Sequence, residues 1–308
     1  MIIEIFFLLI GIFLLAKLSM LTIKYATNFS RVAGISQMAV GFIIIAVSTS
    51  IPELTIAVIS SLKGEGVLSI GNVIGANVSN ITLIFGIMAL SGFMVSRKIS
   101  YESRMILIIT SIVAFFLLAL QKIDYAFGIF SIIVFCFFSK MIIMDGKKTK
   151  KHEKHAKKPE IFMPLLCLLL SIAGVIISAN IVTDSAIKLS SIIGIAESVI
   201  GATIIAISTT MPELSVALAA LKKRNIELAV GDGIGSILTN ITLVAGVASL
   251  INPVIIGSVL NFGLVSLLIV NVIVFFLISR GKFKLREAII LLSVYAAFVF
   301  SMLFVGAL

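Results

Sequence analysis

The chain has 308 residues, of which 60% are hydrophobic and 12% are charged, and its mean hydropathy is +1.25. A chain of this composition cannot cover the surface of a soluble domain, so soluble classes of protein are excluded. The formal net charge of +10 is compatible with nucleic acid or anionic lipid as a partner, but its distribution along the chain indicates membrane topology instead. The composition therefore predicts an integral membrane protein.

A membrane-spanning helix needs roughly 20 apolar residues, and the chain offers ten such stretches. In chain order they lie at about 2–23, 33–61, 67–94, 105–121, 124–144, 161–182, 193–221, 226–251, 256–279 and 287–307. The first stretch has no basic residue before Lys17, which predicts a retained helix and not a cleaved signal. One long hydrophilic run, 145–160, divides the chain into two halves of five helices, 1–144 and 161–308.

Basic residues are distributed unequally between the two sides of the membrane that ten helices define. With the N-terminus outside, the cytoplasmic loops and the adjoining helix ends hold 21 of the 24 Lys and Arg residues. The opposite loops hold only Lys63, Lys122 and Lys188. The positive-inside rule therefore predicts a multi-pass protein of the cell membrane with both termini outside and the 145–160 loop in the cytoplasm.

One stretch of the sequence occurs twice. Residues 41–90 and 201–250 align without a gap, at an offset of 160 residues, with 21 identities in 50 positions. Five helices make up each half, and five is odd, so the second copy enters the membrane upside down relative to the first. Homologous segments of opposite orientation are typical of secondary transporters, whose substrate site lies near the midplane. The predicted fold is an all-α membrane protein of ten transmembrane helices in two inverted five-helix repeats, with helices 2, 3, 7 and 8 broken at the core.

Each copy contains a proline that interrupts a helix, in STSIPE at 48–53 and in STTMPE at 208–213. Proline lacks a backbone donor and clashes with the preceding turn, so we expect the carbonyls of about Ala46–Ser48 and Ala206–Ser208 to lose their helical partners. Freed carbonyls beside hydroxyls and a carboxylate at membrane depth suit an oxygen-ligated cation. A structural kink, with Ser and Thr bonded back to the helix, is the alternative interpretation.

A second break in each copy combines glycines with an asparagine, in GNVIGANVSN at 71–80 and in GDGIGSILTN at 231–240. Paired glycines let helices approach closely. Asn80 and Asn240 each follow the second glycine by five residues, and an amide oxygen can ligate a cation without adding charge. An interhelical hydrogen bond is the alternative role for either asparagine.

Only two of the 14 acidic residues, Glu53 and Glu213, lie deep in the apolar stretches, and Asp232 lies nearer an end of its helix. No basic residue lies in the middle of these helices, so both carboxylates are costly unless they are protonated or neutralised by a cation. All nearby candidate ligands are oxygens, which favours Ca²⁺ or Na⁺ over zinc or copper. Two negative charges match one Ca²⁺, two Na⁺ or two protons, as in an antiporter whose substrates compete for one pair of glutamates. We expect Asp232 to be an acidic residue of the cytoplasmic vestibule or a cap on the helix break.

Other reactive side chains indicate no further site. Cys136 and Cys167 lie in separate apolar stretches and predict neither a disulfide nor a zinc site. His152 and His155 lie in the basic loop, where a solvated segment is favoured over a metal site. The hydroxyl and carboxylate clusters lack a His, Lys or Cys that would activate a nucleophile, so we do not expect an enzyme. A cation channel would use the same oxygen ligands, but inverted repeats with broken helices favour alternating access.

In combination, the two copies of S-T-[ST]-x-P-E-L followed by G-[ND]-x-I-G-x-x-x-x-N resemble the alpha-repeats of the calcium/cation antiporter superfamily, and most closely its prokaryotic sodium/calcium exchanger branch. The resemblance covers essentially the whole chain. It implies a diamond of cation sites between helices 2, 3, 7 and 8, and no cofactor. Helices 1 and 6 would be the gating pair that slides across this core.

The resemblance also implies roles for individual positions. Ca²⁺ would be bound by carboxylates, hydroxyls and carbonyls, which come from Glu53, Glu213, Thr49, Thr209, Ala46 and Ala206. Flanking Na⁺ sites would use Ser50, Thr210 and Ser236. Asn80 and Asn240 would line the centre.

Two positions depart from the family pattern. Asn240 stands where related prokaryotic exchangers can have Asp, which lowers the charge of the site and removes a titratable group. Ala76 stands where a Ser hydroxyl is usual, whereas Ser236 keeps that hydroxyl in the second copy, so one Na⁺ site would lack a ligand. We therefore expect antiport of Ca²⁺ and Na⁺ by alternating access in a lipid bilayer, without a nucleic-acid partner, and keep Ca²⁺/H⁺ exchange as the alternative. The G-N-[AG]-x-E type motif of a proton-coupled branch is replaced here by STSIPE.

Overall fold

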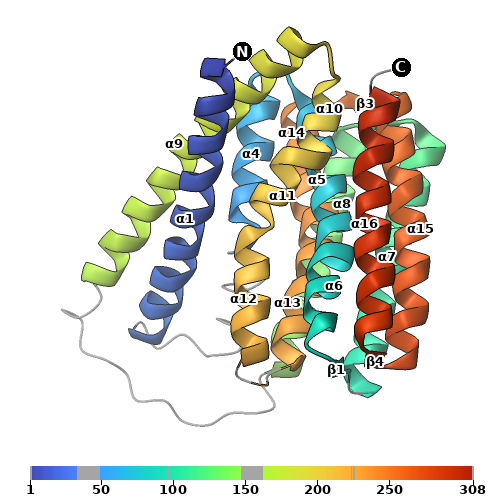
Figure 1. Cartoon of the computed structure of the whole chain (residues 1–308). Coiled ribbons are helices and arrows are strands. Elements are labelled where there is room, and N and C mark those ends of the chain that lie inside the picture. Colours follow the sequence, from blue (N-terminus) through green and yellow to red (C-terminus); the bar gives the residue numbers. More distant parts are fainter. Residues whose placement is uncertain are drawn as a thin grey trace.

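The computed structural model describes residues 2–32, 49–95, 97–146, 162–222, 224 and 226–306. Within these ranges, eight helices are long and apolar enough to cross a membrane, and two shorter apolar helices accompany them, at Ile51–Leu62 and Tyr125–Lys140. Most of the large side chains at the surface are apolar, as a protein surrounded by lipid requires. The prediction of an all-helical membrane protein is thereby confirmed, and Figure 1 shows the helices as one long bundle.

The elements are named in chain order, with η marking a π-helical segment. They are α1 (Ile2–Val32), α4 (Ile51–Leu62), α5 (Gly66–Ser79), η2 (Asn80–Ile84), α6 (Phe85–Leu90), β1 (Phe93–Met94), α7 (Arg97–Leu120), β2 (Lys122–Ile123), α8 (Tyr125–Gly146), α9 (Phe162–Ile193), α10 (Glu197–Ile200), η5 (Gly201–Ile205), α11 (Ala206–Thr209), α12 (Met211–Lys222), α13 (Ile226–Thr239), η6 (Asn240–Val244), α14 (Ala245–Ile251), β3 (Val254–Ile255), α15 (Ser258–Arg280), β4 (Lys282–Phe283) and α16 (Leu285–Gly306).

The sequence duplication is reproduced in the secondary structure. α4 and α12, α5 and α13, and η2 and η6 begin and end at positions that differ by 160 residues. The π-helical segments η2 and η6 begin at the asparagine of the repeat, Asn80 and Asn240 respectively. Short π-helical segments inside α-helices occur frequently at functional sites.

The two halves of the chain interlock at both ends of the bundle. β1 pairs antiparallel with β4 at one end, and β2 pairs antiparallel with β3 at the other (Figure 1). At the core, α6 packs against α16 and α14 packs against α8. The start of α1 and the end of α16 lie at the same end of the bundle as β3 (Figure 1).

The helices divide into an interior group and a peripheral pair. In the apolar 18-residue window of each span, 83% of the residues are buried for Gly66–Leu90 and 72% for Leu228–Ile251, against 22% for Ile2–Tyr25 and 28% for Phe162–Ile193. α1 and α9 pack extensively against each other, and they share a hydrophobic cluster with α4, α5 and η5 that is separate from the main core. The repeat helices therefore form the centre, and α1 and α9 form a layer on one side of it (Figure 1).

Both peripheral helices extend beyond the apolar stretches that the sequence predicts. α1 continues to Val32 and α9 to Ile193. The last turns of α9 still bury Ala186 and Leu189 in the cluster shared with α4, and Lys63 at the end of α4 pairs with Asp184 at 2.7 Å. Hydropathy marks the part of a helix that is embedded in lipid, whereas packing and ion pairs extend the helix past it. The expected start of the second helix, 33–48, and most of the basic loop, 147–161, lie outside the described residues.

Candidate cation site

Two helices of the interior group begin with a proline turn that carries a glutamate. Ser50 precedes α4 with φ −83° and ψ 6°, and Thr210 precedes α12 with φ −83° and ψ 2°. Pro52 and Pro212 lie at the second position of these helices. A backbone N–H has no partner within the helix at that position, so proline costs no hydrogen bond there. Glu53 and Glu213 follow in the same first turn. The positive end of a helix dipole stabilises a carboxylate at this position.

Both glutamates are buried. Glu53 is 0% exposed and Glu213 is 1% exposed, and in the described part of the chain no ion pair involves either of them. Thr209 lies close to Glu53, and Ser236 lies close to Glu213, but no carboxylate oxygen of either glutamate has a hydrogen bond of normal geometry. Buried charges without such partners are costly, so these two carboxylates are the first candidates for binding a cation.

Asp232 is not where the sequence analysis expected it. It is 3% exposed and lies in the second turn of α13, so it is neither an exposed vestibule residue nor a helix cap. Its Oδ1 accepts a hydrogen bond from Thr49 Oγ1 at 3.4 Å, and Thr49 Oγ1 lies 3.2 Å from Ser236 Oγ. The correction has a physical reason, because α13 packs inside the bundle and directs Asp232 toward the chain of the first repeat. A third buried carboxylate therefore joins the site.

The corresponding contact of the other repeat uses an amide. Thr209 Oγ1 donates to Asn72 Oδ1 at 3.3 Å. Asn72 corresponds to Asp232 at the offset of 160 residues, and Ala76 corresponds to Ser236. The two repeats thus present the same threonine to different partners.

The carbonyl of Ala206 is not freed by the proline, contrary to the prediction. It accepts hydrogen bonds from the backbone N–H of Thr210 at 3.1 Å and from Thr210 Oγ1 at 2.9 Å, and Thr209 Oγ1 lies 3.3 Å from it. The reason is the helix register, because Pro212 removes the donor that would serve Ser208 and not the donor that serves Ala206. The corresponding residue of the first repeat, Ala46, lies outside the described residues.

Three asparagines have the most isolated amides of the interior. Asn77, Asn80 and Asn240 are fully buried, and within the described residues neither the oxygen nor the nitrogen of these amides has a hydrogen-bond partner. η2 packs against α12, which carries Glu213, and η6 packs against α4, which carries Glu53. Ser50 Oγ is also buried without a partner. Because buried polar groups are normally satisfied, these groups are candidate ligands too.

The repeat glycines bring the backbones of two interior segments into contact. An added Cβ at Gly71 would lie 2.4 Å from the carbonyl oxygen of Ser198, and one at Gly75 would lie 2.1 Å from that of Ala202. On the facing segment, a Cβ at Gly201 would lie 2.4 Å from the carbonyl oxygen of Leu68. The predicted close approach of helices is therefore confirmed for these glycines, and it holds Asn72 and Thr209 opposite each other.

The site consists of oxygen ligands from several residue types. Among the described residues, no three Asp, Glu, His or Cys side chains lie close enough together to hold one metal ion. The described candidate ligands for a cation here are hydroxyl and amide oxygens together with carboxylates, and oxygen ligands are those that Na⁺ and Ca²⁺ prefer. Asn72, Asn77 and Asp232 were not included in the predicted ligand set. Asn72 and Asp232 precede Asn80 and Asn240 by eight residues, a spacing close to two helical turns that could have indicated the shared face.

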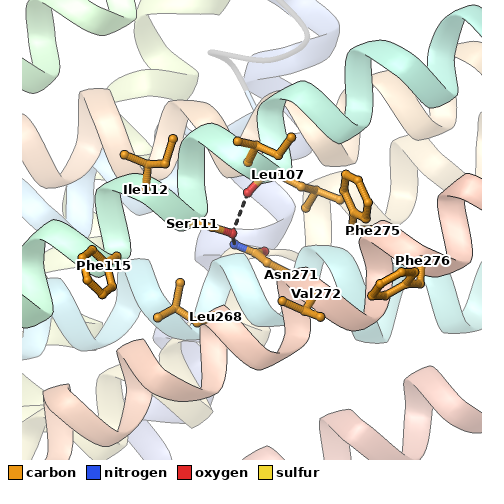
Figure 2. A pocket seen from close by; sticks show the side chains of 10 residues that line it. Leu107, Ser111, Ile112, Phe115, Leu268, Asn271, Val272, Phe275 and Phe276 are labelled. Atoms are coloured by element: carbon orange, nitrogen blue, oxygen red, sulfur yellow. Dashed lines mark hydrogen bonds between the residues drawn. The ribbon is translucent and has the colours of Figure 1, made fainter.

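A hydrophobic groove of about 550 Å³ lies elsewhere, between α7 and α15 (Figure 2). Its polar groups are few, and Asn271 Nδ2 is bonded to Ser111 Oγ at 3.0 Å in its floor. Apolar side chains such as Phe115 and Phe276 form its walls (Figure 2). This groove contains none of the candidate cation ligands.

Comparison with known proteins gives consistent results. The family model of the sodium/calcium exchanger protein matches residues 3–144 and 163–304. The chain is 26% identical to the sodium/calcium exchanger MaX1 of Methanosarcina acetivorans, over 95% of this chain and 96% of that protein. It is 30% identical to the inner membrane protein YrbG of Escherichia coli, over 80% of this chain and 79% of that protein.

The fold is also found among solved structures. The sodium-calcium exchanger NCX_Mj, soaked with Na⁺ and Sr²⁺, matches with a TM-score of 0.70 and 24% identity, over 96% of this chain and 97% of that chain. The resemblance to the prokaryotic branch of the calcium/cation antiporter superfamily is thereby confirmed. Because the family model covers most of the sequence, the chain belongs to the sodium/calcium exchanger protein family.

Proposed function

We propose that the protein is a secondary active antiporter that exchanges Ca²⁺ for Na⁺ by alternating access. The Ca²⁺ site is built on Glu53 and Glu213, with hydroxyls of Thr49 and Thr209 and the carbonyl of Ala46. The carbonyl of Ala206 is left out of this set because it accepts the hydrogen bonds of Thr210. Ser50, Thr210 and Ser236 contribute to Na⁺ sites, and Asn80 and Asn240 line the centre. The relatives named as sodium/calcium exchangers support the choice of ions.

One observation carries this proposal. Two carboxylates at equivalent positions of the two repeats are buried in the first turns of two short helices, and neither forms an ion pair with any residue that the structure describes. Their charge requires compensation in a low-dielectric interior. One divalent ion or two monovalent ions provide that compensation equally well, so one pair of glutamates can alternate between Ca²⁺ and Na⁺.

The arrangement of the elements supports two inverted five-helix repeats, 1–144 and 161–308. β1 of the first half corresponds to β3 of the second half, and β2 corresponds to β4. The pair β1–β4 is therefore equivalent to the pair β3–β2, and the two pairs lie at opposite ends of the bundle (Figure 1). The packed helix pairs α6–α16 and α14–α8 correspond in the same way. α4 and α12 lie in opposite halves of the length of the bundle (Figure 1). A two-fold relation of this kind in the membrane plane is the layout of alternating-access transporters.

The peripheral pair is the moving part in this proposal. α1 and α9 pack mainly against each other, and the hydrophobic cluster that joins them to α4, α5 and η5 is separate from the main core. The three lysines of the predicted outer loops lie at the end of the bundle where α1 begins; they are Lys63, Lys122 and Lys188. This placement agrees with a membrane orientation in which both termini are outside. Sliding of α1 and α9 over the core would expose the glutamates to one side at a time.

The test is ⁴⁵Ca²⁺ uptake into proteoliposomes that contain the full-length protein. The vesicles are loaded with Na⁺, with K⁺ alone, or with K⁺ at acidic internal pH. Uptake driven by the outward Na⁺ gradient alone is the expected result. Uptake that needs the proton gradient would replace the proposal by Ca²⁺/H⁺ exchange, and passive flux without any gradient coupling would favour a channel.

Glu53→Gln and Glu213→Gln test the site itself. Each variant is expected to abolish Na⁺-driven Ca²⁺ uptake, because a neutral amide leaves one carboxylate to balance a divalent ion. Glu4→Gln is the matched control, because Glu4 lies at the outer end of α1, 3.8 Å from Lys188. Normal transport in either buried variant would contradict the assignment.

A further inference from the structure

The threonine of the first repeat lies in a cluster that the other repeat does not reproduce. Thr49 Oγ1 has one proton and lies within reach of both Asp232 Oδ1, at 3.4 Å, and Ser236 Oγ, at 3.2 Å. We call these three residues the Asp232 cluster. Its polar side chains are all nearly or completely buried. Both hydrogen bonds of this cluster are long, so its oxygens are not tightly bonded to each other.

The equivalent positions of the other repeat, Thr209, Asn72 and Ala76, form the Asn72 cluster. Thr209 Oγ1 donates to Asn72 Oδ1 at 3.3 Å. A neutral amide here replaces the carboxylate, and a methyl group replaces the second hydroxyl. The two clusters are therefore related by the repeat but differ by one full charge and one ligand.

Within the described residues, the carboxylate of Asp232 has no basic partner. Its Oδ2 is buried and has no hydrogen-bond partner, and within the described residues it forms no ion pair. A carboxylate in this condition destabilises the fold unless it is protonated or a cation neutralises it. Asn72 imposes no such requirement on the opposite cluster.

Asp232 also does not join the two glutamates around a single ion. It acts electrostatically on both Glu53 and Glu213, so all three lie in one region. However, no three acidic side chains of the described residues are close enough together to share one metal ion. Asp232 therefore defines a position next to the Ca²⁺ site.

We propose that the Asp232 cluster is a cation site of its own, with the carboxylate of Asp232 as a direct ligand of Na⁺, and that the Asn72 cluster is a much weaker site. One carboxylate and two hydroxyls match a hard monovalent ion in charge and ligand type. This inference rests on the proposed exchange function and specifies which side of the site holds the driving ion more tightly. Asp232 thus supplies a negative charge in an exchanger that has Asn240 at its centre.

The experiment is binding of ²²Na⁺ to the purified full-length protein without Ca²⁺, with choline keeping the ionic strength constant. Asp232→Asn is expected to weaken Na⁺ binding by about tenfold or more, because it removes a unit charge at contact distance from the ion. The double variant Asn72→Asp/Ala76→Ser rebuilds the Asp232 cluster on the opposite side. It is expected to add a tight Na⁺ component to the isotherm.

The outcomes separate this inference from the proposed function. An unchanged Na⁺ isotherm in Asp232→Asn would overturn the assignment of the ligand, even where Ca²⁺ uptake by the wild type is driven by Na⁺. If Asp232→Asn does not fold, as judged by size-exclusion chromatography, the double variant decides, and no gain of Na⁺ binding there overturns the proposal. Loss of Na⁺ binding in Asp232→Asn together with wild-type uptake driven only by protons would support the site and refute the function.

Discussion

The contact between α5 and η5 at Gly75 provides a sharp test of how the site is held together. In Gly75→Ala, the added methyl group would lie 2.1 Å from the oxygen, 2.5 Å from the carbon and 2.6 Å from the Cα of Ala202. All three atoms belong to the backbone, so no side chain can rotate away. Ordinary contact requires the two segments to separate by over an ångström.

The expected loss of stability follows from two opposing terms. Overpacking costs about 3 kcal/mol where the neighbours cannot move, and alanine gains about 1 kcal/mol over glycine inside a helix. The net destabilisation of Gly75→Ala is therefore about 2 kcal/mol. Gly233→Ala is the matched control within α13, because its added methyl group would meet no atom of the described residues closer than 3.7 Å. This variant should gain up to about 1 kcal/mol.

Reversible unfolding in mixed detergent micelles measures both variants against the wild type. Na⁺-driven Ca²⁺ uptake should also fall in Gly75→Ala, because separation of the two segments breaks the contact between Thr209 and Asn72. If Gly75→Ala proved as stable as Gly233→Ala, the close backbone contact would not exist in the protein. The glycine would then need another explanation.

Two further predictions concern charge. Asn240→Asp should strengthen competition between protons and Ca²⁺ at mildly acidic pH, because it adds a carboxylate beside the pair of glutamates; an unchanged pH profile of ⁴⁵Ca²⁺ uptake would show that Asn240 does not face the ion. Asp124 precedes α8, accepts a hydrogen bond from the N–H of Phe127 at 3.2 Å and pairs with Lys122 at 2.7 Å. The hydrogen bond from Lys122 is the main cause that lowers the pKa of Asp124. The ionised Asp124 carboxylate stabilises the folded protein at pH values above the ordinary pKa of aspartate. This stabilisation is lost as the pH falls through the lowered pKa of Asp124 in the folded protein. Asp124→Ala should therefore lower the thermal midpoint at pH 7 but not at strongly acidic pH, and a pH-independent difference would contradict this role.

Much of the fold could be predicted because the relevant physics is local or compositional. The mean hydropathy excludes a soluble domain, and the apolar stretches mark the embedded parts of the helices. Gly71 and Gly75 indicate close helix contacts, because only a residue without a side chain allows backbones to approach to that distance. Glu53 and Glu213 stand out because an unpaired carboxylate in an apolar stretch always requires compensation.

The sequence could not reveal which polar groups meet across the repeats. Thr49 and Asp232 are 183 positions apart, and whether Asp232 is exposed or buried depends on how α13 is rotated in the bundle. The Ala206 carbonyl shows the same limit at short range, since the exact register of a proline break decides which carbonyl is freed. The ends of α1 and α9 were missed because packing beyond the lipid extends them.

By itself, the sequence determined that this is a duplicated membrane protein with two deeply placed glutamates, because the transfer of charge into lipid is so costly that carboxylates in apolar stretches stand out. Only the tertiary structure decided that Asp232 is buried and that it contacts Thr49 of the other repeat. The physical reason is that a short side chain has its surroundings set by the neighbouring helices. Those neighbours come from the other half of the chain.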